Sequence, residues 1–296
     1  LYCMYLPADL ISFHSTGRGD LSNTLPYRRG PDFGMDMISN PAGYSNWLHA
    51  DILYARRESI KNPFSTWQLS SLKRSVWIEG APQFLMKNDL TVDIFVYTSN
   101  HIPPDYDINI FIMNKTSFSP KGVGQILPSP VTTIYSEDNP HIERIGKNHL
   151  ILFFDSDNKP GGLGLHDLWY STSHNNGDSW SKPASVKSIN TENDEHQPHL
   201  FQNKEGKWFL YYTATNKEDK KPGIFRAQQG KNDNWDSWIN RELVIGAGNT
   251  LGVGEPTLTK YGDISFVVIY EKINPKKTDR YDADPWFLPK QDSPAN

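Results

Sequence analysis

Hydrophobic and aromatic residues come in short runs along this chain, and Gly, Pro, Asn and Asp separate the runs. Runs of this kind predict short strands, and helical periodicity is almost absent. Four runs occupy matching places, at residues 92–96, 150–154, 208–212 and 266–270. The last three start 58 residues apart (208−150 and 266−208), so the pattern predicts a repeated all-β unit.

A proline repeats with the same period. The clearest copy of its setting reads Glu195-His196-Gln197-Pro198-His199-Leu200. The four prolines are Pro82, Pro140, Pro198 and Pro256, in steps of 58 (140−82, 198−140 and 256−198). A repeat as regular as this decides the architecture before any single motif does.

Each period is expected to hold four strands: strand A carries the proline, strand B the aromatic run, and strands C and D follow. Radially repeated four-stranded sheets are the blades of a β-propeller. We predict a single all-β domain, a five-bladed β-propeller with four antiparallel strands per blade. The predicted blades are residues 1–70, 71–130, 131–188, 189–246 and 247–296.

The first blade departs from the period. His49-Ala50-Asp51 matches His166-Asp167, two periods later (167−51 is 116), so residues 48–57 are expected to form strand C. Strand B is then Leu1 to Tyr5, and residues 6–47 form a long insertion between the two strands. The pattern lacks strand A of the first blade and strand D of the fifth.

Composition limits the choice of partner. The chain has 296 residues, 37% of them hydrophobic, and a net charge of −4. Because there is no Lys/Arg block, we expect no nucleic-acid partner. No apolar run approaches the ~18 residues of a membrane span, so we expect no membrane partner. Cys3 is the only cysteine, which excludes an internal disulfide and leaves the compartment open.

Carboxylates gather just before strand A. The residue three before the proline is Glu79, Glu137 and Glu195 in three blades, and Glu255 directly precedes the fourth proline. Because strand A lines a propeller axis, we expect these groups to converge at one mouth. Like charges held close raise one another's pKa, which can create an acid and a base. The alternative is that they cap turns and bond the backbone.

Two histidines follow the repeated proline, His141 and His199, where the other blades have Gln83 and Thr257. They are candidates for binding substrate or a metal, with packing between strands as the alternative. No three-ligand metal spacing is evident. We therefore expect no cofactor, although the central channel leaves room for a structural calcium ion.

The insertion at residues 6–47 is expected to lie over the acidic mouth, because it joins strands B and C. Loops of this length inside a compact domain are usually functional or disordered. Arg28 and Arg29 are candidates for recognising a carboxylate or sulfate, and His14 is a further candidate for contacting substrate. A solvated loop is the alternative.

Three resemblances emerge from these motifs. Ser173 to Trp180 resembles the sialidase Asp-box, with Asn175 where Asp is usual. Residues 189–198 resemble the WD40-like propeller repeat of periplasmic proteins, which implies a fold and no fixed activity. We expect a secreted or periplasmic location. Asp138-Asn139-Pro140-His141 and the stretch from Glu195 to Tyr212 resemble elements of the five-bladed glycosidases, the arabinanase, β-xylosidase and invertase-like group.

The glycosidase resemblance implies roles for particular residues. Glu195 would be the general acid, and Asp138 would tune and orient that acid. The general base of that group is an Asp on strand A of blade one, which the pattern lacks. Three acidic residues of the insertion are possible substitutes: Asp20, Asp32 and Asp36.

The sequence thus supports a carbohydrate-active enzyme, glycoside hydrolase-like, that acts on a glycan at the acidic mouth. A non-catalytic propeller that binds a glycan or a protein with the same face is the alternative. A third reading, a metal-dependent nucleotidase or lyase on the same fold, requires a metal. The substrate, its linkage and the oligomeric state are not specified by the sequence.

Overall fold

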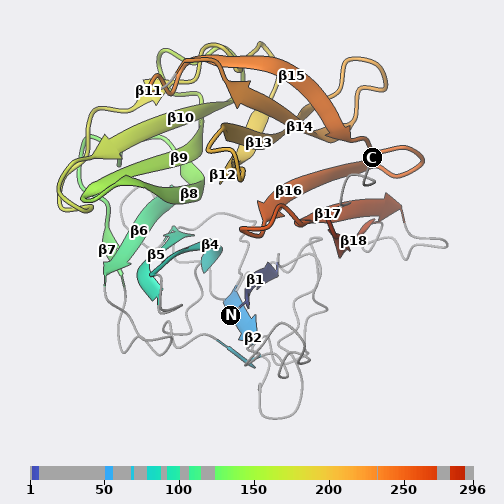
Figure 1. Cartoon of the computed structure of the whole chain (residues 1–296). Helices are drawn as coiled ribbons and strands as arrows, with labels where there is room; N and C mark the ends of the chain where they lie inside the picture. The colour runs from blue at the N-terminus through green and yellow to red at the C-terminus, as the bar shows by residue number, and fades with distance from the viewer. Residues whose placement is uncertain are drawn as a thin grey trace. The chain divides into compact units, whose positions relative to one another are not determined.

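A computed structural model describes residues 2–6, 51–55, 68–69, 79–87, 92–100, 107–114, 124–231, 233–271 and 281–290. Every regular element in these ranges is a β-strand (Figure 1). Within the same ranges, no helix has the length and hydropathy needed to cross a membrane. The chain divides into two compact units, residues 1–140 with 272–280 and residues 141–271 with 281–296.

The first unit contains two antiparallel sheets. One has the order β1-β2-β3 and the other the order β4-β5-β6-β7, and β4 lies against β1 and β2. The strands are β1 (Tyr2–Leu6), β2 (Asp51–Ala55), β3 (Gln68–Leu69), β4 (Glu79–Met86), β5 (Val92–Ser99), β6 (Asn109–Asn114) and β7 (Gln125–Ile126).

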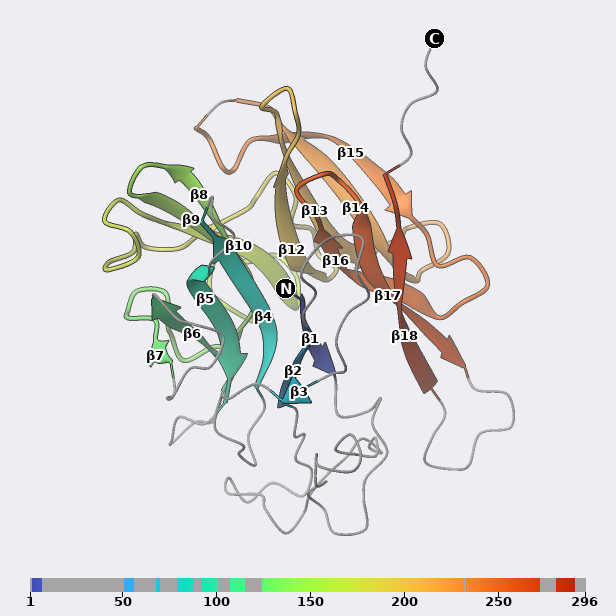
Figure 2. The ribbon, with the colours of Figure 1, turned by 60° about the horizontal axis from the view of Figure 1, so that its bottom comes forward.

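The second unit begins within β8 (Glu137–Gly146) and contains three antiparallel sheets, ordered β11-β10-β9-β8, β12-β13-β14-β15 and β16-β17-β18 (Figures 1 and 2). Its other strands are β9 (His149–Asp157), β10 (His166–Ser173), β11 (Ala184–Ser185), β12 (Glu195–Gln202), β13 (Trp208–Thr215), β14 (Pro222–Gln229), β15 (Trp238–Ile245), β16 (Gly252–Leu258), β17 (Ile264–Glu271) and β18 (Tyr281–Leu288).

Within each unit, the first strand of a sheet lies against the preceding sheet. In the second unit β12 lies against β9 and β10, and β16 lies against β12, β13 and β14. This is the arrangement of consecutive propeller blades, so the predicted all-β propeller class is confirmed. The count of five blades and the single-domain boundaries stay predictions.

The repeated proline lies in a β-bulge. The residue directly before it has a positive φ in all four copies: 43° at Ala81, 49° at Asn139, 55° at Gln197 and 57° at Glu255. The strand register shifts at this point in β4, β12 and β16. A bulge accommodates a proline that a regular ladder would exclude, and it re-aims the side chains beside it.

Aromatic side chains fill the space between the sheets of the second unit. Phe153 is fully buried and packs edge-on against Trp235 and Trp238. The indole Nε1 of Trp238 donates to the carbonyl of Trp235 at 2.7 Å, and Trp180 donates to Gly177 at 3.1 Å in the same way. In both turns, therefore, a buried tryptophan side chain bonds the backbone three residues before it.

The turn from Ser173 to Trp180 is held by Asn175. Its Oδ1 accepts from the Ser173 hydroxyl and the Ser179 amide, both at 2.9 Å, and its Nδ2 donates to Ser179 Oγ. Asn175 thus organises the turn through its own side chain, as Asx residues commonly do. The likeness to an Asp-box remains a resemblance, and the turn lies at the end of β10 opposite His166.

Gly164 couples two loops of the second unit. It lies between β9 and β10, and a Cβ added there would come within 2.0 Å of the Asn193 carbonyl oxygen and 3.1 Å of the Thr191 carbonyl oxygen. Both obstacles are backbone atoms of the loop before β12. The two loops therefore approach as closely as they do only because residue 164 has no side chain.

We expect Gly164→Ala to lower the free energy of unfolding by about 1–3 kcal/mol, because the added methyl group forces two backbone segments apart. Urea denaturation of the purified protein measures this. Gly246→Ala is the control: its Cβ would meet only the Leu243 side chain, at 3.4 Å, so its effect should stay within about 0.5 kcal/mol. Equal midpoints for the two variants would refute the close-packing explanation.

Candidate functional site

The glutamates predicted to line the mouth are buried. Glu137 is 0% exposed, Glu195 1% and Glu79 7%. Glu195 accepts from the Thr191 amide and from the Thr191 hydroxyl, both at 2.7 Å. Glu137 accepts from the amide and hydroxyl of Thr133, four residues upstream, in the same way.

This geometry matches the turn-capping alternative, because each of the two carboxylates holds the loop that precedes its own strand. Burial raises the pKa of Glu195, and the two hydrogen bonds from Thr191 oppose that rise. Glu79 and Glu137 belong to the first unit, and Glu195 and Glu255 to the second. Their convergence at one mouth, and their catalytic roles, stay predictions.

The other acidic candidates lie at the bulges. Asp138 is partly buried, and its Oδ1 accepts from the amide of Asn139 at 2.7 Å. The amide of Glu255 donates to Gln197 Oε1 at 2.9 Å and to Thr213 Oγ1 at 3.2 Å. The backbone next to both carboxylates is therefore held by hydrogen bonds of the main-chain amides.

The two histidines after the prolines lie in the interior of the second unit. His141 is 4% exposed and His199 6%, and their ring centroids are 4.1 Å apart. The Leu258 amide donates to His199 Nε2 at 3.2 Å, which requires that nitrogen to be unprotonated. Burial lowers the pKa of His141 to about 3 and that of His199 well below its ordinary value. Packing between adjacent first strands accounts for both; substrate contact stays a prediction.

Predictions for the insertion fall outside the described residues. This applies to Arg28, Arg29 and His14, and to the three possible base substitutes, Asp20, Asp32 and Asp36.

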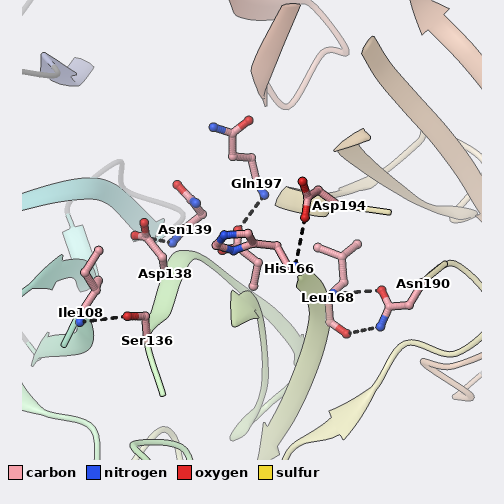
Figure 3. Close-up of polar contacts among 10 residues, drawn as sticks. Ile108, Ser136, Asp138, Asn139, His166, Leu168, Asn190, Asp194 and Gln197 are labelled. Carbon is pink, nitrogen blue, oxygen red and sulfur yellow. Dashed lines mark hydrogen bonds and ion pairs between the residues drawn. The ribbon is translucent and has the colours of Figure 1, made fainter. Parts of the chain in front are cut away.

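A polar cluster lies where β9 ends and where β10 and β12 begin (Figure 3). Its members are Asp155, His166, Asp194, His196 and Gln197, all in the second unit. The His166 side chain is 46% exposed, whereas the side chain of Asp155 is 2% exposed, and His166 Nδ1 lies 4.0 Å from Asp155 Oδ1. The polar cluster thus pairs a buried carboxylate with an accessible imidazole.

Backbone hydrogen bonds hold the polar cluster together. The amide of Gln197 donates to Asp155 Oδ2 at 2.8 Å, and the amide of His166 donates to Asp194 Oδ1 at 3.1 Å (Figure 3). The imidazoles of His166 and His196 are 6.2 Å apart. Burial, and then the nearby His166, lowers the pKa of His196 to about 4.

Two loops form the border of the polar cluster. Asp167 is 1% exposed, and its Oδ2 accepts from the amides of Leu163 and Gly164 at 2.9 and 3.1 Å. Asn190 pairs with the backbone of Leu168 through two 2.9 Å bonds, which fixes the start of the loop that carries Asp194 (Figure 3). Leu163 is 60% exposed at the same border, so an apolar group lies beside the polar ones.

No group of three or more His, Cys, Asp or Glu residues with metal-binding geometry occurs in the described ranges. The predicted calcium ion in the central channel is not tested by this observation.

The pairing of Asp155 with His166 was not predicted from the sequence. One signal was available: Asp155 is a charged residue directly after the apolar run Leu150 to Phe154. Its partner is eleven residues away (166−155), across a loop of unknown course. The antiparallel pairing of β9 with β10 brings the two residues together.

Comparison with solved structures finds the same fold in glycoside hydrolases. An endo-arabinase from Bacteroides thetaiotaomicron VPI-5482 matches with a TM-score of 0.52 at 12% identity, over 83% of this chain and 89% of that one. A thermostable family-43 glycoside hydrolase matches at 0.53, with 15% identity over 82% and 83%. The catalytic domain of the Coprinopsis cinerea GH62 alpha-L-arabinofuranosidase matches at 0.56, with 11% identity over 79% and 81%. No protein-family model and no curated protein matches the sequence.

We expect Glu195→Gln to lower the free energy of unfolding by about 1–3 kcal/mol, because an amide cannot accept both hydrogen bonds that Thr191 donates. Thermal denaturation measures the change. Glu137→Gln is the matched variant and should behave alike. If Glu195→Gln left stability unchanged and abolished a glycosidase activity, the general-acid role would be favoured instead.

We expect the buried histidines to make stability depend on pH. His141 has a pKa of about 3 in the folded chain and 6.5 in the unfolded one, so the unfolded chain binds more protons between these values. Stability is therefore lost as pH falls from 6.5 towards 3, by about 1.4 kcal/mol per pH unit.

His141→Gln isolates this contribution, because Gln83 holds the equivalent place in β4. Urea unfolding of both proteins from pH 7 to pH 4 should show a flatter profile for the variant. Parallel profiles would contradict the neutral, buried state of His141.

Proposed function

We propose that the protein is a carbohydrate-active enzyme, glycoside hydrolase-like, that acts on a glycan at the polar cluster. The observation that carries the proposal is the likeness to an arabinase and an arabinofuranosidase over about four fifths of each chain. Fold likeness does not fix an activity. The polar cluster adds what a glycosidase requires, an accessible proton-transfer group next to carboxylates.

The surroundings of the polar cluster suit a sugar. Carbohydrates carry many hydroxyl groups and present apolar ring faces. The carboxylate of Asp194 can accept from hydroxyls, and Leu163 supplies exposed apolar surface at the border. A polymeric glycan would be met outside the cytoplasm, which agrees with a secreted or periplasmic location.

The second candidate function is a non-catalytic propeller that binds a glycan or a protein. One observation favours it: the residue that the glycosidase resemblance makes the general acid, Glu195, is 1% exposed and bonded through both oxygens. We propose that an enzyme with Glu195 held in this way uses the groups of the polar cluster in the second unit.

We expect the purified protein to release sugar from arabinan, from aryl arabinofuranosides, or from another member of a glycoside panel. Asp194→Asn should then lower kcat/KM at least 100-fold, in the range typical of general acid–base residues, because the amide cannot accept a proton while it still accepts from the His166 amide. Release of reducing sugar measures both effects.

Asp178→Asn is the control: the same substitution at an exposed position in the turn at the other end of β10, with no expected change. Absence of hydrolysis across the panel, with glycan binding retained in calorimetry, would favour the second candidate function.

A further inference from the structure

His166 differs from the two histidines that follow the repeated prolines. His141 and His199 are buried, whereas the side chain of His166 is 46% exposed at the beginning of β10. Its neighbour Asp155 is among the most buried acidic residues of the described chain, at 1% exposed. An accessible imidazole backed by a buried carboxylate is the arrangement in which a histidine exchanges protons with a ligand.

We propose that His166 is the proton-donating catalytic residue of this site, positioned by Asp155, and that its substrate is a glycoside. This rests on the proposed function above. It assigns the acid role to a histidine of β10 instead of the buried glutamate of β12.

The polar atoms of Asp155 and His166 have different contacts. Asp155 Oδ2 accepts the Gln197 amide at 2.8 Å, so the carboxylate is fixed in orientation by the neighbouring sheet. Oδ1 faces His166 Nδ1 at 4.0 Å. Catalytic hydrogen bonds are often long without substrate and shorten in the complex. Because Nδ1 faces the carboxylate, Nε2 on the far side of the ring is left for the ligand.

Five titratable groups lie around His166: Asp155 on β9, Asp157 on β9 as the register partner of His166, Asp167 on β10, Asp194 in the loop before β12, and His196 on β12. Four are carboxylates, so the surroundings of His166 are strongly acidic. His196 is partly buried and uncharged near neutral pH, since its pKa is about 4. It therefore does not compete for the role of proton donor.

Hydrolysis of the glycosidic bond at this site uses water as its only co-reactant. The Nε2 proton of His166 passes to the glycosidic oxygen while the bond from that oxygen to the anomeric carbon breaks, and the oxygen keeps the electron pair. The oxygen of a water molecule bonds to the anomeric carbon, and the water gives one proton to Asp194. Solvent then restores the proton to His166 and removes the one from Asp194.

The test compares His166→Ala with wild type on glycosides whose leaving groups differ in acidity. Alkyl and phenyl glycosides require a proton on the departing oxygen, whereas dinitrophenyl glycosides leave without one. His166→Ala should lose about 10²–10⁴-fold in kcat/KM on the first kind and stay within a few fold of wild type on the second. Added imidazole should restore part of the lost activity.

His174→Ala is the matched control, an exposed histidine in the turn at the other end of β10, and it should leave both substrate series unchanged. Asp155→Asn keeps an acceptor for the Gln197 amide and removes the charge, so it should show a smaller loss with the same dependence on leaving group. Where His166→Ala does not fold, His166→Gln takes its place.

Equal losses on both substrate series, or none, would overturn the role of His166 while the proposed function stands. A wild-type protein inactive on every glycoside would overturn the proposed function, and the proton-donor role with it. Selective loss on the poor leaving groups, with rescue by imidazole, supports both.

Discussion

The amide hydrogen bond at each bulge joins one sheet of the second unit to the next. The amide of Gln197 donates to Asp155, and the amide of Glu255 donates to Thr213. Both donors and both acceptors are 58 residues apart (255−197 and 213−155), so the bond belongs to the repeat. A left-handed conformation costs a non-glycine residue about 1–2 kcal/mol, and here the same bond that docks the sheets also stabilises that conformation.

The polar cluster depends on this bulge. An extra residue in a strand changes which face the side chains at the bulge and after it occupy, so Gln197 is placed by the irregularity and not by simple alternation. Asp155 is buried. Its Oδ2 accepts the amide hydrogen bond of Gln197 at the bulge, and its Oδ1 faces His166. A buried carboxylate is costly without partners. In this protein one carboxylate supports both the docking of sheets and the orientation of an imidazole.

The strands of the fold could be predicted because period and composition agree: the runs that begin at Val92, Leu150, Trp208 and Phe266 lie in β5, β9, β13 and β17. The glutamates were placed correctly at the start of the first strands. Their burial was harder to foresee, because it depends on a threonine four residues upstream that bonds both carboxylate oxygens. The pairing of His166 with Asp155 depends on strand register and a loop approach through Gly164, which a one-dimensional pattern does not encode.

In the second unit the link between sheets uses the main-chain amide of the residue before proline, at Gln197 and at Glu255. That position holds Ala81, Asn139, Gln197 and Glu255 in the four copies, and all four adopt the same left-handed conformation. Copies with different side chains therefore share one backbone conformation, and at Gln197 the side chain also joins the link, because its Oε1 accepts from the Glu255 amide. Each copy is free to acquire its own chemistry, so new ligand specificities can arise one blade at a time.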